Sequence, residues 1–364
     1  MNNLIFYMIL FKIIFTQNYS SKFIEDEFKK YLKKFNKTYL SKQEYLKHLN
    51  LFNSSFYKVI NHNKNNSFKL SLNKFSDLTL EEKKKYKRGK IMKHEVKVNK
   101  KFRFLKGKDD YSDKDIDKEK MDLPKNFDYR ELGGITEVSN QGICGSCAVF
   151  SIVSLIEHYY FMKENELKKF SEQQIIDCAT DTDTDICLSG STCWDILKYI
   201  AKKGIMEYEN YPYESGYTGR KSKCRYNEKD VVTKISSYRL VDNPKPINIK
   251  KYLYKYGPIS TSINYCGLAD YYNGIVDYSS SKCPNSIYDV HHAVTIVGWG
   301  YDEETQTDYW IVRNSYGKKW GNNGYMYVKY GKNTLGIENQ IYFVSSNFIK
   351  IYKILFYFIL MILF

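Results

Sequence analysis

The 364-residue chain lacks the features of a nucleic-acid-binding protein, although its formal net charge is +15. It contains no zinc-finger spacing and no basic patch interleaved with aromatic residues, which mark that class. The positive charge is also unevenly placed, because residues 123–346 hold 25 basic and 26 acidic side chains. Lysine and arginine instead concentrate in residues 83–108, ahead of the mixed-charge run 109–120. This stretch has no apolar periodicity and is typical of a solvated linker, so we expect no nucleic-acid partner.

The chain also lacks an apolar run long enough to span a bilayer easily. Residues 4–15 are apolar except for Lys12 and are typical of a signal peptide, which we expect to occupy residues 1–20, with an uncleaved anchor as the alternative. Residues 348–364 are almost wholly apolar, and seventeen helical residues extend about 25 Å, slightly less than the hydrocarbon core. Residues 347–364 therefore form a hydrophobic tail that is either a short membrane anchor or a terminal peptide that is clipped or packs on the protein.

Three separated motifs supply the side chains of a nucleophilic hydrolase. Cys147 ends the segment QGICGSC at the expected start of a helix, where backbone N–H groups and the helix dipole stabilise a thiolate and lower its pKa. Gln141 provides an amide donor six residues upstream, His292 precedes Ala-Val, and Asn314 opens Asn-Ser-Tyr-Gly. Taken singly, a buried cysteine, a core histidine and a turn asparagine are ordinary structural residues. Together they favour a Cys/His/Asn hydrolase.

The order and local sequence of these motifs resemble papain-like, cathepsin-type cysteine proteases. Residues 123–130, 171–178 and 211–213 also match that family, so the resemblance covers most of the chain. It implies that Cys147 attacks the peptide carbonyl and that His292 holds the proton and delivers it to the leaving amine. It further implies that Asn314 orients the imidazole, and that the Gln141 side chain and the Cys147 backbone N–H stabilise the oxyanion. With His292 protonated beside the thiolate, we expect activity from mildly acidic to neutral pH.

The neighbouring His291 is an alternative to His292. We prefer His292 because the family motif has the catalytic imidazole directly before Ala-Val.

Residues 21–85 have apolar and aromatic positions at helical spacing and resemble the family's inhibitory propeptide. Its two motifs can be followed through Glu44, His48, Phe52, Ser55, Val59 and Asn63, then Asn73, Phe75 and Asp77. His48 and Ser55 replace the usual Arg and Asn, and Ser71 replaces a Gly. The resemblance implies an intramolecular inhibitor that occludes the cleft. We expect residues 86–122 to be a charged linker cleaved between about residues 108 and 123, ahead of a peptidase domain at 123–346.

The predicted fold class is α+β, with a papain-like two-lobe architecture and a cleft between a helical lobe and a β-rich lobe. The first half of the peptidase domain has helical patterns at 147–162, 171–178 and 194–203, with caps at Ser171 and Thr192. The second half is rich in aromatic and β-branched residues, and its expected strands are 259–263, 292–298, 309–313, 324–330 and 341–345.

Several positions depart from the family pattern near the expected cleft. Ala148, Tyr316 and Tyr129 each stand where the family usually has Trp, and Tyr316 occupies the position that shields the Asn–His hydrogen bond. Smaller side chains there admit water more easily, so we expect reduced turnover.

Substrate contacts are assigned by resemblance alone. Ser189 and Gly190 replace a Gly-Gly pair in the groove, Gln340 matches the base of the pocket for the side chain two positions before the scissile bond, and Tyr316 and Trp320 complete the set. A polar amide in that pocket favours neutral side chains. Because no exopeptidase-specific insertion is evident, an endopeptidase is expected.

Eight cysteines and a signal-like start indicate an oxidising compartment. By resemblance Cys144 pairs with Cys187 and Cys178 with Cys224. The usual partner of Cys283 is replaced by Leu335, so we expect a local Cys266–Cys283 bridge instead, with Cys193 as the free thiol. The predicted location is the secretory pathway, in a lysosome-like or vacuole-like compartment or outside the cell.

Some of these residues also fit other functions. Cys144 and Cys147 form a C-x-x-C motif, which in a thioredoxin-like protein exchanges disulfides, and with Cys187 and Cys193 they offer zinc ligands. No βαβ unit surrounds the motif, and neither function uses His292 or Asn314. A binding-only pseudoenzyme of the same fold is the nearer alternative, given the substitutions at the cleft. We expect no cofactor and no metal, a monomer, and protein or peptide substrates.

The hydrophobic tail generates a first testable expectation. If residues 348–364 anchor the protein, the full chain will pellet with membranes and resist carbonate extraction, because apolar burial is insensitive to high pH. A variant lacking residues 348–364 will then stay in the supernatant. Equal extraction of both proteins would contradict an anchor.

Overall fold

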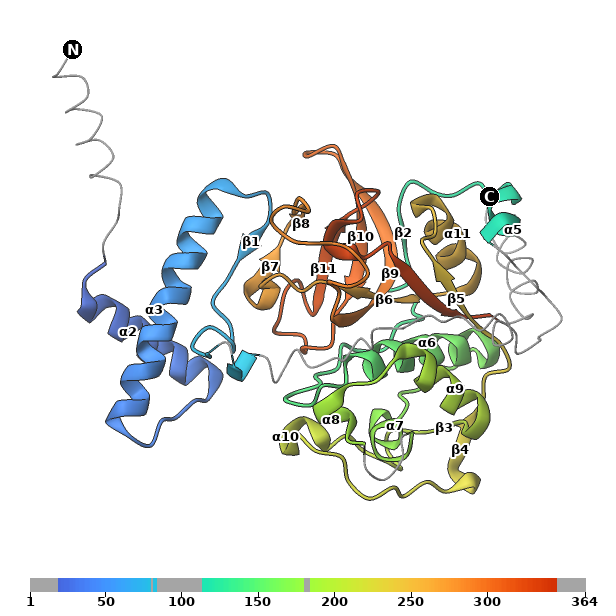
Figure 1. The fold of residues 1–364 in the computed structure, drawn as a ribbon, viewed down its shortest axis with the longest axis horizontal. Helices are drawn as coiled ribbons and strands as arrows, with labels where there is room; N and C mark the ends of the chain where they lie inside the picture. Colours follow the sequence, from blue (N-terminus) through green and yellow to red (C-terminus); the bar gives the residue numbers. More distant parts are fainter. Residues whose placement is uncertain (1–18, 80, 84–112, 180–183, 346–364) are drawn as a thin grey trace, which may run out of the picture.

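The structure, a computed structural model, describes residues 19–79, 81–83, 113–179 and 184–345. Two N-terminal helices, α2 (Ser21–Phe35) and α3 (Lys42–Asn65), lie beside a two-lobed body, with the sheet above and most helices below in Figure 1. The predicted tail and nearly all of the predicted signal peptide fall outside the described residues. Within the described parts of the chain, no helix is long and apolar enough to cross a membrane.

The helical lobe is built around α6 (Cys147–Glu164). Its first thirteen residues are all buried, which is the pattern of a helix surrounded by protein on every side. The other elements of this lobe are α7 (Glu172–Cys178), α8 (Ile186–Ser189), α9 (Cys193–Lys203), α10 (Ser215–Thr218), the 3₁₀ turn η2 (Glu228–Asp230) and the short pair β3 (Ile205–Met206) and β4 (Val231–Thr233).

The second lobe is an eight-stranded, mostly antiparallel sheet. Its strands run in the order β5-β12-β6-β9-β10-β11-β8, and β2 pairs with the far end of β9. The bounds are β2 (Phe127–Asp128), β5 (Tyr238–Asp242), β6 (Ile259–Ile263), β8 (Ile275–Val276), β9 (His292–Asp302), β10 (Thr307–Arg313), β11 (Tyr325–Lys329) and β12 (Gln340–Val344). Helix α11 (Pro246–Tyr256) covers one side, and the 3₁₀ turns η3 (Leu268–Asp270) and η4 (Thr334–Gly336) complete the lobe.

Helix α6 packs directly against β9, and buried hydroxyl groups fix that contact. The Ser151 hydroxyl donates to the Val294 carbonyl at 2.8 Å, and its oxygen lies 2.7 Å from the Ser260 hydroxyl. The Thr295 Oγ1 lies 3.0 Å from the hydroxyls of both Ser151 and Ser154. Each hydroxyl has a partner, so burying them costs little and fixes how the helix sits on the sheet.

The predicted two-lobe α+β fold is confirmed, and the predicted helices and strands agree with the structure to within a few residues except for β9. Strand β9 continues to Asp302, four residues beyond the expected end. The predicted caps are also present, since the Ser171 and Thr192 hydroxyls accept from the backbone N–H three residues later. Helix α11 and strand β5 were not predicted, because their short amphipathic stretches give a weak signal.

The stretch predicted as an irregular linker contains a helix, α5 (Asp113–Lys118). A second unexpected element is β1 (Lys69–Leu70), which pairs antiparallel with β7 (Tyr271–Asn273) of the sheet lobe. Asn63 holds β1 in place, because its side chain donates to the Leu70 carbonyl at 2.9 Å and accepts from the Leu70 N–H at 2.8 Å. The N-terminal helices are therefore joined to the body by strand pairing.

The N-terminal helices have their own small core and one buried carboxylate. Phe28 and Phe52 are fully buried between α2 and α3. Asp77, also fully buried, accepts hydrogen bonds from the Tyr31 hydroxyl, the Tyr39 hydroxyl and the Lys37 ammonium. The imidazole of His48 stacks on Tyr39 and bonds to the Asp77 carbonyl. The substituted His48 thus remains part of the motif's hydrogen-bond network.

Three disulfides join Cys144 to Cys187, Cys178 to Cys224 and Cys266 to Cys283. These are the pairs expected from the sequence, including the local Cys266–Cys283 bridge. The remaining thiols, Cys147 and Cys193, are both buried.

Buried His158 on α6 makes the stability of the peptidase domain depend on pH. Its Nδ1 lies 2.9 Å from the Gly134 carbonyl, and the ring packs against Tyr129. Burial lowers the pKa of His158 to about 4 from an ordinary value of 6.5. Between these values the unfolded chain binds more protons, so stability falls as the pH falls, by about 3 kcal/mol in total.

We therefore expect urea unfolding of the wild-type protein to show a steep loss of stability between pH 6.5 and 4. His158→Gln, which cannot titrate, should flatten that part of the curve. An unchanged slope in the variant would assign the loss to other groups.

Candidate active site

Cys147 is the first residue of α6 and lies where the helix meets the sheet. Ser146 precedes it with a non-helical backbone and no side-chain cap, so the N–H groups of the first turn are not taken up by a capping side chain. Cys147 is 2% exposed, and its Sγ accepts a hydrogen bond from the Ala293 backbone N–H at 3.4 Å. Because Ala293 follows His292 on β9, this contact fixes the thiol beside the histidine.

His292 begins β9 and is completely buried. Its Nε2 lies 2.8 Å from the Oδ1 of Asn314, the residue that follows β10. The same Oδ1 accepts the Ser315 N–H at 2.8 Å, while the Asn314 N–H donates to the Gly324 carbonyl at 3.0 Å. The oxygen of the Asn314 side chain therefore faces the imidazole, which requires Nε2 to carry a proton.

Aromatic rings enclose the His292–Asn314 pair. Tyr316 stacks on the imidazole with a centroid distance of 5.1 Å and an interplanar angle of 29°. Trp320 stands edge-on to Tyr316 at 5.7 Å and donates its indole N–H to the Ala269 carbonyl at 3.0 Å. Tyr316 is 3% exposed and Trp320 2%, so the smaller tyrosine still shields the hydrogen bond from water.

Tyr265 also contributes to the site, although no sequence motif predicts it. Its ring stands edge-on to His292 at 5.4 Å and to Tyr316 at 5.7 Å, and it is 1% exposed. The residue lies between β6 and η3, where no periodic pattern marks it as buried. Only the folded structure brings this ring to the imidazole, where it adds bulk next to the position at which the family's tryptophan is missing.

Gln141 is buried beneath the loop that precedes α6. Its Nε2 donates to the Cys144 carbonyl at 2.9 Å, and its Oε1 accepts from the Ser315 hydroxyl at 2.5 Å. The Gln141 N–H also donates to the Ser315 carbonyl at 2.8 Å, so the glutamine is tied to the segment that carries Asn314. These bonds hold the Gln141 side chain beside the loop that leads into Cys147.

The thiol is not activated in the way that the sequence analysis expected. Burial raises the pKa of the Cys147 thiol above its usual value, and hydrogen bonds from the backbone N–H groups of Ala293, Ala148 and Cys147 itself lower it only in part. Desolvation of a thiolate outweighs the helix terminus here, because the sulfur is almost inaccessible to water. In this form of the chain, burial favours the neutral thiol of Cys147 over the thiolate.

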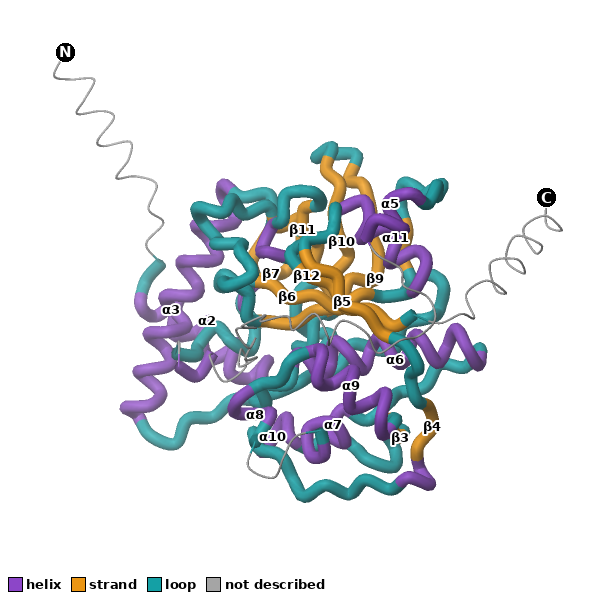
Figure 2. Tube along the Cα trace, turned by 45° about the vertical axis from the view of Figure 1, so that its right-hand side comes forward, coloured by secondary structure: helices purple, strands orange, loops and turns teal. Residues whose placement is uncertain are grey.

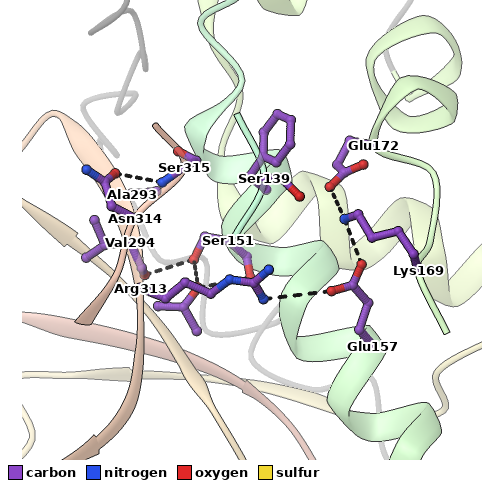
Figure 3. Close-up of a pocket in the computed structure, with 12 residues that line it drawn as sticks. Ser139, Ser151, Glu157, Lys169, Glu172, Ala293, Val294, Arg313, Asn314 and Ser315 are labelled. Carbon is purple, nitrogen blue, oxygen red and sulfur yellow. Dashed lines mark hydrogen bonds and ion pairs between the residues drawn. The ribbon is translucent and has the colours of Figure 1, made fainter. Parts of the chain in front are cut away.

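A buried cluster of charges lies next to Asn314 and crosses from one lobe to the other (Figure 3). Lys169 forms ion pairs with Glu157 on α6, at 2.8 Å, and with Glu172 on α7. Arg313 at the end of β10 lies 3.8 Å from Glu157 and donates to the Thr136 hydroxyl at 3.0 Å. Burial favours the neutral form of Lys169, but Glu157 and Glu172 outweigh it and raise its pKa.

The effect of this cluster is to fix the residue before Asn314. Removing one member would leave a buried charge unpaired, which is strongly destabilising. Arg313 therefore anchors the end of β10 to the helical lobe, and Asn314 follows directly from that anchor.

The residues expected to bind substrate lie on separate elements of the fold. Ser189 is the last residue of α8, and its hydroxyl lies 2.9 Å from the Asp185 carbonyl and 3.2 Å from the Gly190 carbonyl. Gly190 has a positive φ of 73°. Gln340 begins β12, donates to Asp242 at 2.5 Å and accepts from the Tyr342 hydroxyl at 2.7 Å. Trp320 is buried behind Tyr316, so its role here is to support that ring.

The segment after β1 lies against the site from the outside. Phe75 packs edge-on against Tyr316 at 5.4 Å, and the Lys74 ammonium donates to the Tyr316 carbonyl at 3.2 Å and to the Asn140 side chain at 3.0 Å. The Asn73 side chain donates to the Ala269 carbonyl at 2.6 Å. Lys58 on α3 adds an ion pair with buried Asp270 at 2.8 Å. The N-terminal region therefore covers the same aromatic group that shields His292.

Two alternative functions lose their support. Cys144 is bonded to Cys187 rather than to Cys147, so the C-x-x-C motif is not a redox pair in this structure. Among the residues that the structure describes, no group of His, Cys, Asp and Glu side chains is arranged to hold a metal ion. Cys193 lies 3.5 Å from the Ser260 hydroxyl, and burial raises the pKa of its thiol to about 12, as for an inert structural cysteine.

Comparison with known proteins divides the chain in the same way. Residues 123–345 match the papain family of cysteine proteases, and residues 28–82 match the cathepsin propeptide inhibitor domain. A viral cathepsin of Bombyx mori nuclear polyhedrosis virus is 30% identical over 345 residues, which cover 94% of this chain and 98% of the relative. The pro-cathepsin H of Mus musculus is 32% identical over 322 residues, or 85% of this chain and 87% of the relative.

A solved structure has the same arrangement of both parts. The digestive procathepsin L2 proteinase from Tenebrio molitor larval midgut matches with a TM-score of 0.78 at 26% identity, over 89% of this chain and 100% of the other.

The aromatic group around His292 generates a kinetic prediction. Tyr265→Ala leaves a cavity beside the imidazole, so we expect turnover of a peptide substrate to fall about tenfold, or about 1.4 kcal/mol, with little change in KM. Tyr265→Phe keeps the ring and should stay close to wild type. Tyr272→Ala, at a half-exposed position nearby, is the control. Equal turnover in the Tyr265→Ala and wild-type enzymes would remove the proposed contribution of this ring.

Proposed function

Because the chain belongs to the papain family of cysteine proteases and carries a cathepsin propeptide domain, we propose that it is an endopeptidase zymogen that uses Cys147, His292 and Asn314 as catalytic residues. The observation that carries this proposal is the pair of contacts across the lobes. The Cys147 sulfur accepts from the Ala293 N–H, and the adjacent His292 bonds to Asn314 at 2.8 Å. Together they align a nucleophile, a base and an orienting amide.

The proposed reaction begins when the Cys147 proton moves to His292 Nδ1, which gives a thiolate and an imidazolium. The sulfur attacks the peptide carbonyl, and the oxyanion is stabilised by the Cys147 backbone N–H and the side-chain amide of Gln141. His292 then protonates the leaving amine, and water activated by the neutral imidazole hydrolyses the thioester. Asn314 keeps its oxygen on Nε2 throughout, so that Nδ1 always faces the sulfur.

The zymogen is inhibited by its own N-terminal region in this proposal. We assign residues 1–20 to a signal peptide, 21–85 to the propeptide, 86–122 to the processed region, 123–346 to the peptidase and 347–364 to a tail. The contacts of Phe75, Lys74 and Asn73 around Tyr316 and Ala269 support inhibition, because they hold the propeptide against the site. Burial also raises the pKa of Cys147, which favours the thiol form in the precursor.

The disulfides bear on where the protein is located. Three of them support folding in the secretory pathway, with a lysosome-like compartment or the exterior of the cell as the destination.

For substrate specificity we propose a pocket formed beside Gln340, whose amide is fixed between Asp242 and the Tyr342 hydroxyl. Because the nitrogen and the oxygen of this amide are both hydrogen-bonded within the protein, the amide discriminates only weakly among substrate side chains. We therefore propose a preference for neutral side chains two positions before the scissile bond.

The test uses the activated enzyme and a blocked fluorogenic dipeptide. Wild type should hydrolyse it and should be inactivated by an epoxide that alkylates one thiol. Cys147→Ala should lose more than about a thousandfold in kcat, since the nucleophile is gone. Cys193→Ser is the matched control, because that thiol is buried and unreactive, and it should keep wild-type activity. Peptide hydrolysis by Cys147→Ala would reject the assignment, and a processed wild type without hydrolysis would indicate a pseudoenzyme.

A further inference from the structure

Helix α5 lies in the region expected to be removed on activation, yet it packs against the peptidase domain. Figures 1 and 2 both show α5 beside α11, on the opposite side of the body from α2 and α3. Helices α2 and α3 have a separate core of their own, while Phe68, Leu70 and Phe75 of the segment after α3 enter the core of the sheet lobe. The position of α5 therefore associates this segment with the domain that follows it in the chain.

One lysine of α11 closes the C-terminal end of α5. The Lys251 Nζ donates to the backbone carbonyls of Ile116, Asp117 and Glu119 at 3.0, 3.1 and 2.7 Å. The last carbonyls of a helix have no partners within it, and a cation there also interacts favourably with the helix dipole. A single ammonium group thus supplies three hydrogen bonds at the end of a six-residue helix, where the Ile116 carbonyl also accepts from the Glu119 N–H at 3.2 Å.

Ion pairs and apolar contact add to this attachment. Lys245, just before α11, pairs with Asp117 at 2.7 Å, and Lys255 near its end pairs with Glu119. The Ile116 side chain is completely buried and belongs to the core cluster of the sheet lobe, together with Ile249 and Leu253 of α11. Met121 and Leu123 pack against the same cluster, so the apolar contact continues along the chain to the start of the peptidase domain.

We propose that residues 113–122 stay attached to the mature enzyme as an N-terminal clasp, and that activation cleaves the chain before Asp113. A protease binds its substrate as an extended strand, whereas this backbone is helical, hydrogen-bonded to Lys251 and anchored by a buried isoleucine. Cleavage after Met121 would instead expose the Ile116 contact and take three acceptors from Lys251. The inference rests on the proposed zymogen, and it narrows the expected cleavage range of 108–123 to its first part.

The first experiment does not require the protein's own activity. The full-length Cys147→Ala chain is digested with a protease that cuts after lysine, and the fragments are followed by intact mass. We expect rapid cuts at lysines between residues 83 and 108 and at least tenfold slower cleavage after Lys118. Ile116→Asp should release the clasp and bring cleavage after Lys118 to the rate of the upstream sites. Asp122→Ala, at an exposed position in the same segment, is the control.

The second experiment determines the N-terminus of wild-type enzyme activated by removal of its propeptide. A mature chain that begins at or before Asp113 supports the clasp. A mature chain that begins between Met121 and Leu123, or cleavage after Lys118 as fast as upstream, overturns it. Because the digestion uses an inactive chain, an absence of peptidase activity would count against the proposed function and leave the first experiment decisive for the clasp.

Discussion

The packing of α6 against β9 is the contact on which the rest of the site depends. It brings Cys147, at the start of a helix in one lobe, to the backbone N–H of Ala293, at the start of a strand in the other. The Ser151 and Thr295 hydroxyls fix how the helix sits on that strand, and they are satisfied only in this arrangement. A small shift of the helix would break those bonds and move the sulfur away from His292 at the same time. Stability and catalysis are therefore coupled through one interface.

The second lobe-to-lobe connection is electrostatic. Glu157, Lys169 and Glu172 belong to the helical lobe, and Arg313 reaches them from the end of β10. A buried cluster of this kind contributes little net stability, but it is intolerant of change because each charge relies on the others. Because Arg313 directly precedes Asn314, the cluster also fixes the position of Asn314. The aromatic rings of Tyr316, Tyr265 and Trp320 complete the enclosure from the other side.

Both segments before the peptidase domain bury apolar side chains in it. The propeptide is joined through the β1–β7 pairing, the Lys58–Asp270 ion pair and the buried side chains of Phe68, Leu70 and Phe75, which belong to the core cluster of the sheet lobe. Helix α5 contributes the fully buried Ile116 to the same cluster. Burial of apolar surface therefore stabilises both attachments. The two segments differ in their place in the chain, because α5 is followed directly by the start of the peptidase domain.

The fold class and most candidate site residues could be predicted from the sequence, because local sequence patterns indicate them. The long apolar stretch after Cys147, the caps at Ser171 and Thr192 and the alternating strands around His292 gave the fold class and most element positions. The three motifs also identified the candidate residues Cys147, His292, Asn314 and Gln141, since each lies in a distinctive local sequence. The Cys266–Cys283 disulfide could also be predicted, because its two cysteines are close in the sequence.

Other features were decided only by the tertiary structure. The contact of Tyr265 with His292, the ion cluster around Lys169 and the attachment of α5 to Lys251 all join residues that are distant in sequence and carry no local signature. The protonation of Cys147 belongs here too. A helix terminus alone predicts a lowered thiol pKa, but the burial that raises it exists only when both lobes are in place. Local sequence determines what a segment prefers to form, whereas desolvation and long-range pairing depend on what the folded chain places around it.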